Sequence, residues 1–138
     1  MLHVAAEADW AIRAHAYTTF PEECCGLLVG SDGEPRTVRE VVAMENVRED
    51  ERARHYLIDP LDLMRQEERL EKEGKTILGF YHSHPTGSAK PSEFDRAHAW
   101  PWYSYVILAI TAAGPGEIFS WRLRDDRSAF DAEPLTLA

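Results

Sequence analysis

Several features that would mark a particular class of protein are scarce or missing in this chain of 138 residues. Its two cysteines, Cys24 and Cys25, are adjacent, which excludes a Cys-x-x-Cys metal pair and argues against a structural disulfide. No apolar run approaches the roughly 18 residues of a membrane span. Residues 1–7 lack the basic and apolar regions of a signal peptide. We therefore expect a cytoplasmic protein that does not bind a membrane.

Positively charged residues are also fewer than negatively charged ones. The chain has 15 Lys and Arg against 24 Asp and Glu, which gives a formal net charge of -9 at pH 7. Nucleic acids and anionic membranes attract basic surfaces, so neither is expected as the main partner. A hydrophobic content of 44% with 28% charged residues is typical of a globular chain. The length suits one domain spanning residues 1–138. Nothing in the sequence indicates an oligomeric state.

Helical patterns occur in three places. Ala6, Trp10, Ala14 and Tyr17 recur at helical spacing, so residues 6–19 are expected to form a helix that packs on a sheet through this face.

A second helix is expected between Asp59 and Gly74, because Asp59 and Pro60 are typical of an N-cap and a first helical position. The second half of this helix is almost entirely charged, which predicts a solvated face. A third helix is expected after Ser92, another N-cap residue type.

Short apolar runs bounded by turn residues predict six or seven strands. The first two flank the turn sequence at residues 31–35 and are expected to pair as a hairpin. Helices and strands alternate without a repeat or a linker, which predicts a mixed α/β (α+β) domain with about three helices flanking one curved sheet. The expected strands are residues 24–30, 37–44, 55–58, 76–81, 104–111 and 117–123, with a last one within 129–137. On a strand, the adjacent Cys24 and Cys25 would point to opposite faces.

Two histidines end the apolar run at residues 76–81. Their spacing of two puts His82 and His84 on the same face of a strand. Asp95 lies on the first turn of the helix after Ser92 and can reach back toward both rings. Two imidazoles and one carboxylate form the ligand set of a catalytic zinc site, which keeps a position open for water. The same ligand types occur in non-haem iron oxygenases, so the residue types alone leave zinc and iron as alternatives.

Other metal folds that use a His-x-His pair fit this sequence poorly. A barrel amidohydrolase needs about 250 residues. A cupin would have Glu four residues after the second histidine, where this chain has Ser88. A nucleobase deaminase would need a Cys-x-x-Cys pair.

A second acidic motif, Pro21-Glu22-Glu23-Cys24-Cys25-Gly26, precedes the first buried strand. Together with His82-x-His84-Pro85 and Ser92-x-x-Asp95 it resembles the JAMM motif of the MPN family of zinc metallopeptidases. The resemblance covers most of the chain and is closest to the compact prokaryotic members. It implies an MPN-like domain with a mostly antiparallel sheet.

The resemblance also implies a role for each motif residue. His82, His84 and Asp95 would bind one zinc ion, with water as the fourth ligand. Glu23 would be the general acid and base that moves the proton of the water. Ser92 would donate a hydrogen bond to the developing oxyanion, a role that it could combine with capping the helix.

Several neighbouring residues allow other interpretations. Glu22 is equally acidic, and only the Glu-x-Cys-Gly register favours Glu23. His98 lies one turn after Asp95 but is expected at the surface or in packing. The aromatic segment 100–103 either lines a substrate groove or packs in the core and its rim. The charged residues 46–54 are expected to form an exposed loop.

Family members hydrolyse amide or isopeptide bonds after the Gly-Gly tail of ubiquitin-like proteins, as the resemblance implies. The compact prokaryotic members are associated with ubiquitin-like sulfur carriers, from which they release cysteine or a C-terminal extension. We therefore expect a peptidase that acts on a sulfur carrier. Deconjugation of a ubiquitin-like protein modifier is the nearest alternative. A non-catalytic MPN scaffold module is less favoured, because such modules usually lose ligands and this chain has all of them.

Overall fold

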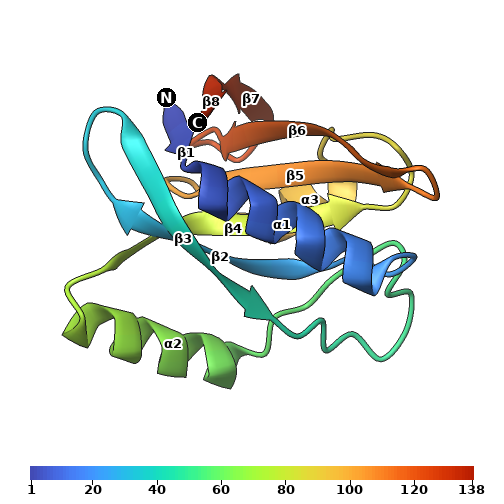
Figure 1. The fold of residues 1–138 in the computed structure, drawn as a ribbon, viewed down its shortest axis with the longest axis horizontal. Coiled ribbons are helices and arrows are strands. Elements are labelled where there is room, and N and C mark those ends of the chain that lie inside the picture. Colours follow the sequence, from blue (N-terminus) through green and yellow to red (C-terminus); the bar gives the residue numbers. More distant parts are fainter.

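The computed structural model describes residues 1–138 as three helices and one sheet of eight strands (Figure 1). In chain order the elements are β1 Leu2–Val4, α1 Ala6–Thr19, β2 Cys25–Ser31, β3 Arg36–Met44, α2 Pro60–Lys72, β4 Thr76–His84, α3 Glu93–His98, β5 Ser104–Thr111, β6 Gly114–Leu123, β7 Phe130–Glu133 and β8 Leu135–Leu137.

The strands are ordered β7-β6-β5-β4-β2-β3-β1-β8, and four of the seven pairings are antiparallel. The two edge strands, β7 and β8, are separated in the chain by Pro134 alone. The sheet must therefore curl until its two edges approach each other, since one residue cannot span a flat sheet of eight strands. This confirms the predicted mixed α/β fold with a curved, mostly antiparallel sheet.

Helix α1 packs on one face of the sheet, but not through the predicted side chains. Trp10 and Tyr17 are 73% and 72% exposed, whereas Ala8, Ile12 and Ala16 are buried. The alanines on this face let the helix backbone approach the sheet closely while Ile12 fills the core, and this packing outweighs the larger aromatic area on the other side. The predicted face was therefore wrong, although the bounds of the helix were right.

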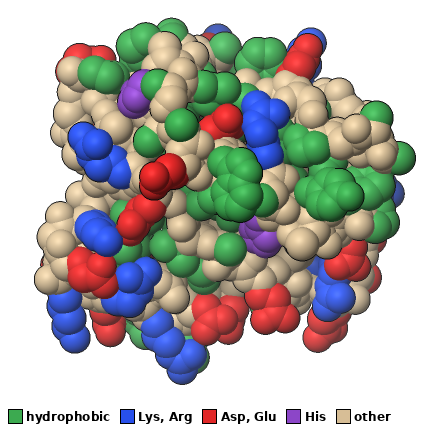
Figure 2. All heavy atoms as spheres, viewed as in Figure 1, with side chains coloured by type: hydrophobic (Ala, Val, Ile, Leu, Met, Phe, Trp, Pro, Cys, Tyr) green, Lys and Arg blue, Asp and Glu red, His purple; other side chains and the backbone are tan.

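The other face of the sheet carries α2 and a second, smaller core. Cys24 belongs to the core under α1, and Cys25 to the core that includes Leu70 of α2. The two cysteines therefore point to opposite faces, as expected for neighbours on a strand, and both are free thiols. Charged side chains of both signs gather over α2, at the lower left of Figure 2.

The predicted helix ends are confirmed where a local cap defines them. The side chain of Asp59 accepts a hydrogen bond from the backbone of Leu61 at 3.2 Å, and Pro60 starts α2. Gly74 follows the end of α2 with φ of +73°, a conformation that side chains rarely adopt. No helix of the structure is both long and apolar enough to cross a membrane.

The strand predictions were wrong in three respects. Residues 55–58 form no strand. The backbone of His55 bonds to Glu51 O and to the Asn46 side chain, and Leu57 pairs through its carbonyl with Val47 N–H at 2.9 Å and through its N–H with the Asn46 side chain at 3.1 Å. Strand β1 was not anticipated. The single strand expected within 129–137 is two strands at opposite edges of the sheet. The observed total is therefore eight strands and not six or seven.

Candidate active site

The pairing of β2 with β4 brings the two halves of the site together. Cys25 lies opposite His82 in an antiparallel register. The contact continues beyond β2, where Cys24 N–H donates to the hydroxyl of Ser83 at 2.9 Å and Ser83 N–H donates to Cys24 O at 3.2 Å. One residue further, Glu23 reaches the level of His84 on the same face as His82.

Gly26 allows this pairing to be close. A Cβ atom at this position would overlap the buried ring of Tyr81, so the glycine of the Glu-x-Cys-Gly motif leaves room for that ring.

His82, His84 and Asp95 converge on one point, as predicted. The two Nε2 atoms lie 3.0 Å apart. Asp95 Oδ1 lies 3.3 Å from His82 Nε2, and Asp95 Oδ2 lies 3.0 Å from His84 Nε2. Burial disfavours ionisation of Asp95, but the adjacent His82 and the hydrogen bonds to Asp95 outweigh it, so the pKa of Asp95 lies below its ordinary value.

Ser92 fixes Asp95 in this position through a reciprocal capping box at the start of α3. Its hydroxyl accepts from Asp95 N–H at 3.0 Å, while its own N–H donates to Asp95 Oδ2 at 2.9 Å. The predicted N-cap role of Ser92 is therefore confirmed. The side chain is exposed, and its hydroxyl proton is not used in these bonds.

The two histidine rings are held in different ways. Nδ1 of His84 lies 3.0 Å from the carbonyl oxygen of Ser88, which can only accept, so Nδ1 carries a proton and Nε2 is the ring nitrogen that a metal ion would use in place of its proton. Nδ1 of His82 is buried and has no hydrogen-bond partner in the protein. The ring of His82 instead stacks on Tyr56, with centroids 4.6 Å apart and an interplanar angle of 29°.

Glu23 is the buried acid of the pair Glu22-Glu23. Its side chain is 3% exposed, whereas Glu22 is exposed. Burial raises the pKa of Glu23 to about 7, an effect that His82 and His84 partly oppose and Asp95 reinforces. Its Oε1 atom is buried without a hydrogen-bond partner. An unpaired buried carboxylate oxygen is unusual unless a ligand, an ion or a reacting group uses it.

The donor set fits a divalent metal ion. Ligand atoms of Glu23, His82 and His84 lie within 4.8 Å of one another, and Asp95 lies 3.3 Å from His82 Nε2 and 3.0 Å from His84 Nε2. Two imidazole nitrogens and a carboxylate suit zinc, and a second, nearby carboxylate with a raised pKa suits proton transfer. The structure thus brings together Glu23, His82, His84, Ser92 and Asp95, the five residues singled out from the sequence.

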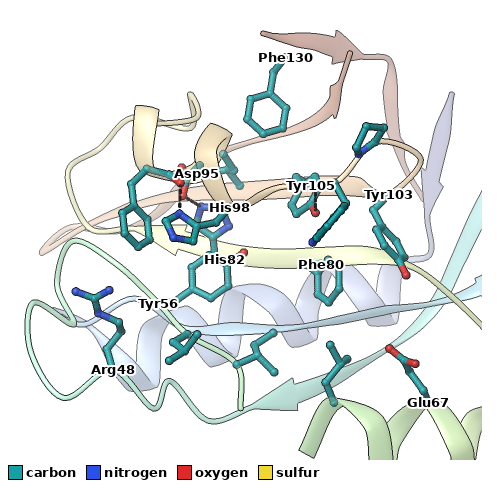
Figure 3. A pocket seen from close by; sticks show the side chains of 17 residues that line it. Arg48, Tyr56, Glu67, Phe80, His82, Asp95, His98, Tyr103, Tyr105 and Phe130 are labelled. Carbon is teal, nitrogen blue, oxygen red and sulfur yellow. Dashed lines mark hydrogen bonds and ion pairs between the residues drawn. The ribbon is translucent and has the colours of Figure 1, made fainter. Parts of the chain in front are cut away.

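A cavity of about 620 Å³ opens beside the histidines and Asp95 (Figure 3). Its lining is mainly apolar and aromatic, and it extends from His82 along Phe80 and Tyr105 toward Glu67 of α2. From the segment 100–103, Trp100, Pro101 and Tyr103 line this cavity.

His98 also lines the cavity, but its Nδ1 atom bonds to the carbonyl of Phe94 at 2.9 Å and its ring stacks on that phenylalanine. His55, in the loop before α2, also stacks on Phe94, with ring centroids 3.8 Å apart. Phe94 therefore attaches α3, which carries Asp95, to this loop.

The loop at residues 46–54 is more closely tied to the site than its charged sequence suggested. The side-chain amide of Asn46 donates to the carbonyls of Glu23 and His55, both at 3.1 Å. The N–H of Glu23 donates to Arg52 O at 2.8 Å. Asn46 therefore links this loop to the backbone of Glu23, and no periodic or motif signal in the sequence identifies this contact.

Two arginines hold the segment 99–103 that forms one wall of the cavity. Arg36 donates to Trp102 O at 3.1 Å and lies over the Trp102 ring at 4.6 Å. Arg127 donates to Ala99 O at 2.7 Å and lies over the Trp100 ring at 4.9 Å. Trp102 has φ of +83°, an unfavourable conformation for a tryptophan that these contacts help to maintain.

Comparison with known proteins agrees with this site. A family model described as prokaryotic homologs of the JAB domain matches residues 6–124. The chain is 39% identical over 113 residues to a desampylase of Haloferax volcanii, covering 78% of this chain and 80% of the relative. It is 40% identical over 96 residues to a probable TtuB-protein conjugate cleaving protease of Thermus thermophilus, covering 70% and 62% of the two chains.

Two further similarities extend over nearly the whole chain. A CysO-cysteine peptidase of Mycobacterium bovis is 28% identical over 138 residues, covering 99% of this chain and 91% of the relative. The solution structure of a protein from Desulfitobacterium hafniense superposes with a TM-score of 0.85 and 31% identity, covering 100% and 93% of the two chains. This chain is therefore a hydrolase of the JAMM metallopeptidase type and belongs to the family of prokaryotic homologues of the JAB domain.

Proposed function

We propose that residues 1–138 act as one zinc-dependent peptidase domain that hydrolyses the amide bond after the C-terminal Gly-Gly tail of a ubiquitin-like protein. The observation that carries this proposal is the convergence of His82, His84 and Asp95 within 3.0 to 3.3 Å beside the unpaired carboxylate of Glu23. We further propose that the metal is zinc, because His82, His84 and Asp95 match the ligand types of its catalytic sites. A cytoplasmic location remains a prediction from the sequence.

In the mechanism, His82, His84 and Asp95 would hold the metal, which supplies a Lewis acid and lowers the pKa of a bound water to about 7. Glu23 accepts the proton of the attacking water at its carboxylate and then returns it to the leaving amine. The raised pKa of Glu23 suits both transfers near neutral pH. The hydroxyl of Ser92 donates a hydrogen bond to the oxyanion as negative charge develops on the scissile carbonyl.

Residues 55–58 offer a place for an extended peptide tail. Leu57 is paired inward, but the backbone groups of Tyr56 and Ile58 form no hydrogen bond, and all three residues line the cavity. Because backbone groups alternate in direction along an extended segment, Tyr56 and Ile58 present a free strand edge. A Gly-Gly tail can pair with such an edge by its main chain alone.

The leaving group defines two candidate substrates. Release of cysteine from a sulfur carrier is supported by the similarity to a CysO-cysteine peptidase over nearly the whole chain. Cleavage of a conjugate between a ubiquitin-like protein and a lysine is supported by the 40% identity to a probable conjugate cleaving protease. Both reactions break an amide bond on the carboxyl side of the tail and differ only in the amine that departs.

A direct competition tests the proposal. The zinc-loaded protein is offered a ubiquitin-like sulfur carrier ending in Gly-Gly-Cys together with the same carrier joined to a lysine side chain, and the products are identified by mass spectrometry. Cleavage after Gly-Gly in either substrate supports the peptidase, and the preferred substrate identifies its leaving group. Cleavage of neither, by protein that binds zinc, would contradict the peptidase and favour a scaffold role.

A matched variant separates chemistry from binding. Glu23→Gln should retain zinc and substrate but lose about 10²–10⁴-fold in kcat, because the amide cannot accept the proton. Glu22→Gln, at the exposed neighbouring position, is the control and should remain active. Full activity of Glu23→Gln would remove this residue from the mechanism.

A further inference from the structure

Tyr56 lies outside the motif but contacts His82, one of the proposed metal ligands. A metal-binding histidine usually donates its other ring N–H to a carboxylate or carbonyl, which fixes the orientation of the ring. His84 has such a partner in Ser88 O, whereas the buried Nδ1 of His82 has none in the protein. The orientation of the His82 ring must therefore be determined by packing.

The ring of Tyr56 supplies that packing. It lies against His82 with centroids 4.6 Å apart and an interplanar angle of 29°, a stacked arrangement that restricts rotation of the imidazole about its Cβ–Cγ bond. Figure 3 shows the two side chains side by side at the end of the cavity that Asp95 also lines.

Tyr56 is itself held in place. Its ring packs against the small core that contains Cys25, Leu27 and Met44. The next residue, Leu57, is anchored by backbone and side-chain hydrogen bonds. The hydroxyl of Tyr56, by contrast, forms no hydrogen bond with the protein, so the ring and not the hydroxyl makes the contact that matters.

We propose that Tyr56 is a positioning residue that holds His82 Nε2 toward His84 and Asp95 by ring stacking, in place of the hydrogen bond that orients His84. This inference rests on the proposed zinc site. It adds to that site a residue outside the motif, contributed by the segment before α2. Tyr56 acts through His82 and does not itself bind the metal.

The test is the zinc affinity of metal-free protein, measured by competition with a chromogenic chelator. Tyr56→Phe keeps the ring and should bind zinc like the wild type. Tyr56→Leu removes the ring and should weaken zinc binding by about 10–100-fold, the usual effect of losing a group that orients a ligand. Tyr56→Met, which fills more of the space without a flat ring, should be weakened in the same direction.

Tyr103→Leu is the matched control, because Tyr103 lines the same cavity and packs on Phe80 and Trp102 but on none of the three proposed ligands. It should leave the zinc affinity unchanged. Thermal unfolding of each metal-free variant identifies any that fails to fold, in which case the remaining ring-less variant carries the test.

The outcomes separate this inference from the proposed function. If the wild type binds no zinc, the proposed function fails. If the wild type binds zinc and a folded Tyr56→Leu or Tyr56→Met binds it equally well, only the role of Tyr56 is contradicted. Equal loss in Tyr56→Phe would assign the effect to the hydroxyl and would also overturn the proposal.

Discussion

Glu23 is buried in the interior, yet its carboxyl group must be ionised before it can accept a proton from water. In metal-free protein its pKa is raised from 4.5 to about 7 by burial. The folded state therefore binds more protons than the unfolded state between these two values, so this residue makes stability fall as the pH rises through that range.

Removing this carboxylate should stabilise the metal-free protein at high pH. We expect Glu23→Gln to exceed the wild type by up to about 3 kcal/mol at pH 8 and to match it near pH 4, where Glu23 is protonated in both states. Urea unfolding at the two pH values measures the difference, with the exposed Glu22→Gln as control. A difference that does not grow with pH would show that the Glu23 carboxylate is not destabilised by burial.

The cysteines should be chemically inert despite their place beside the site. Burial raises the pKa of Cys24 to about 11 and that of Cys25 to about 12, and both are fully enclosed. Because the thiolate is the reactive form, a thiol reagent at pH 7 should modify neither in the folded protein and both after denaturation. Rapid modification of native protein would indicate that the start of β2 opens readily.

At the scale of elements, the segment 99–103 should be sensitive to the arginines that hold it. Arg36 contacts Trp102 O, Ser104 Oγ and Leu78 O, three acceptors that the single ammonium group of lysine cannot reach in the same geometry. Arg36→Lys should therefore raise KM for the protein substrate more than it lowers kcat, because Trp100 and Tyr103 line the cavity while the proposed metal ligands lie elsewhere.

The control for this prediction is Arg39→Lys on the same strand, where the arginine is exposed and forms no ion pair or side-chain hydrogen bond. Zinc content should be unchanged in both variants. A fall in kcat with an unchanged KM would indicate that Arg36 affects the metal site and not the cavity wall.

The elements that could be predicted from the sequence are those defined by local chemistry. Asp59 with Pro60 and Ser92 mark helix starts, because a cap bonds to residues two or three positions away. The common face of His82 and His84 follows from the period of a strand. These local signals located four of the five residues that converge in the site, and Glu23 was added by its resemblance to a known motif.

Other features depend on contacts between distant segments and could not be read from local patterns. The buried face of α1 is decided by how the two alanines and Ile12 fit against the sheet, which the spacing within the helix does not reveal. Residues 55–58 have strand-like composition, but their hydrogen-bond partners Asn46, Val47 and Glu51 belong to the preceding loop and not to a strand. The separation of β7 and β8 to opposite edges follows from the closure of the whole sheet.

At the scale of the molecule, the proposed metal should link folding to function. The ligands come from β4 and α3, so zinc would bind the folded chain and not the unfolded one. At free zinc of about 100 times Kd, unfolding should require about 2.7 kcal/mol more than in chelator. Thermal unfolding with and without chelator measures this shift, and Asp95→Asn should reduce it. An equal shift in Asp95→Asn would remove Asp95 from the ligand set.

The pairing of Cys25 with His82 has a consequence for misfolded forms of the chain. Side chains alternate between faces with a period of two, so a slip of β4 by one residue would turn Ser83 toward the cavity and both histidines away from it. No partly active intermediate register exists, because both imidazoles are lost in the same step. Hydrolytic activity in a preparation would therefore count the molecules whose central strands are correctly aligned, which makes turnover per mole of polypeptide chain a measure of folding fidelity.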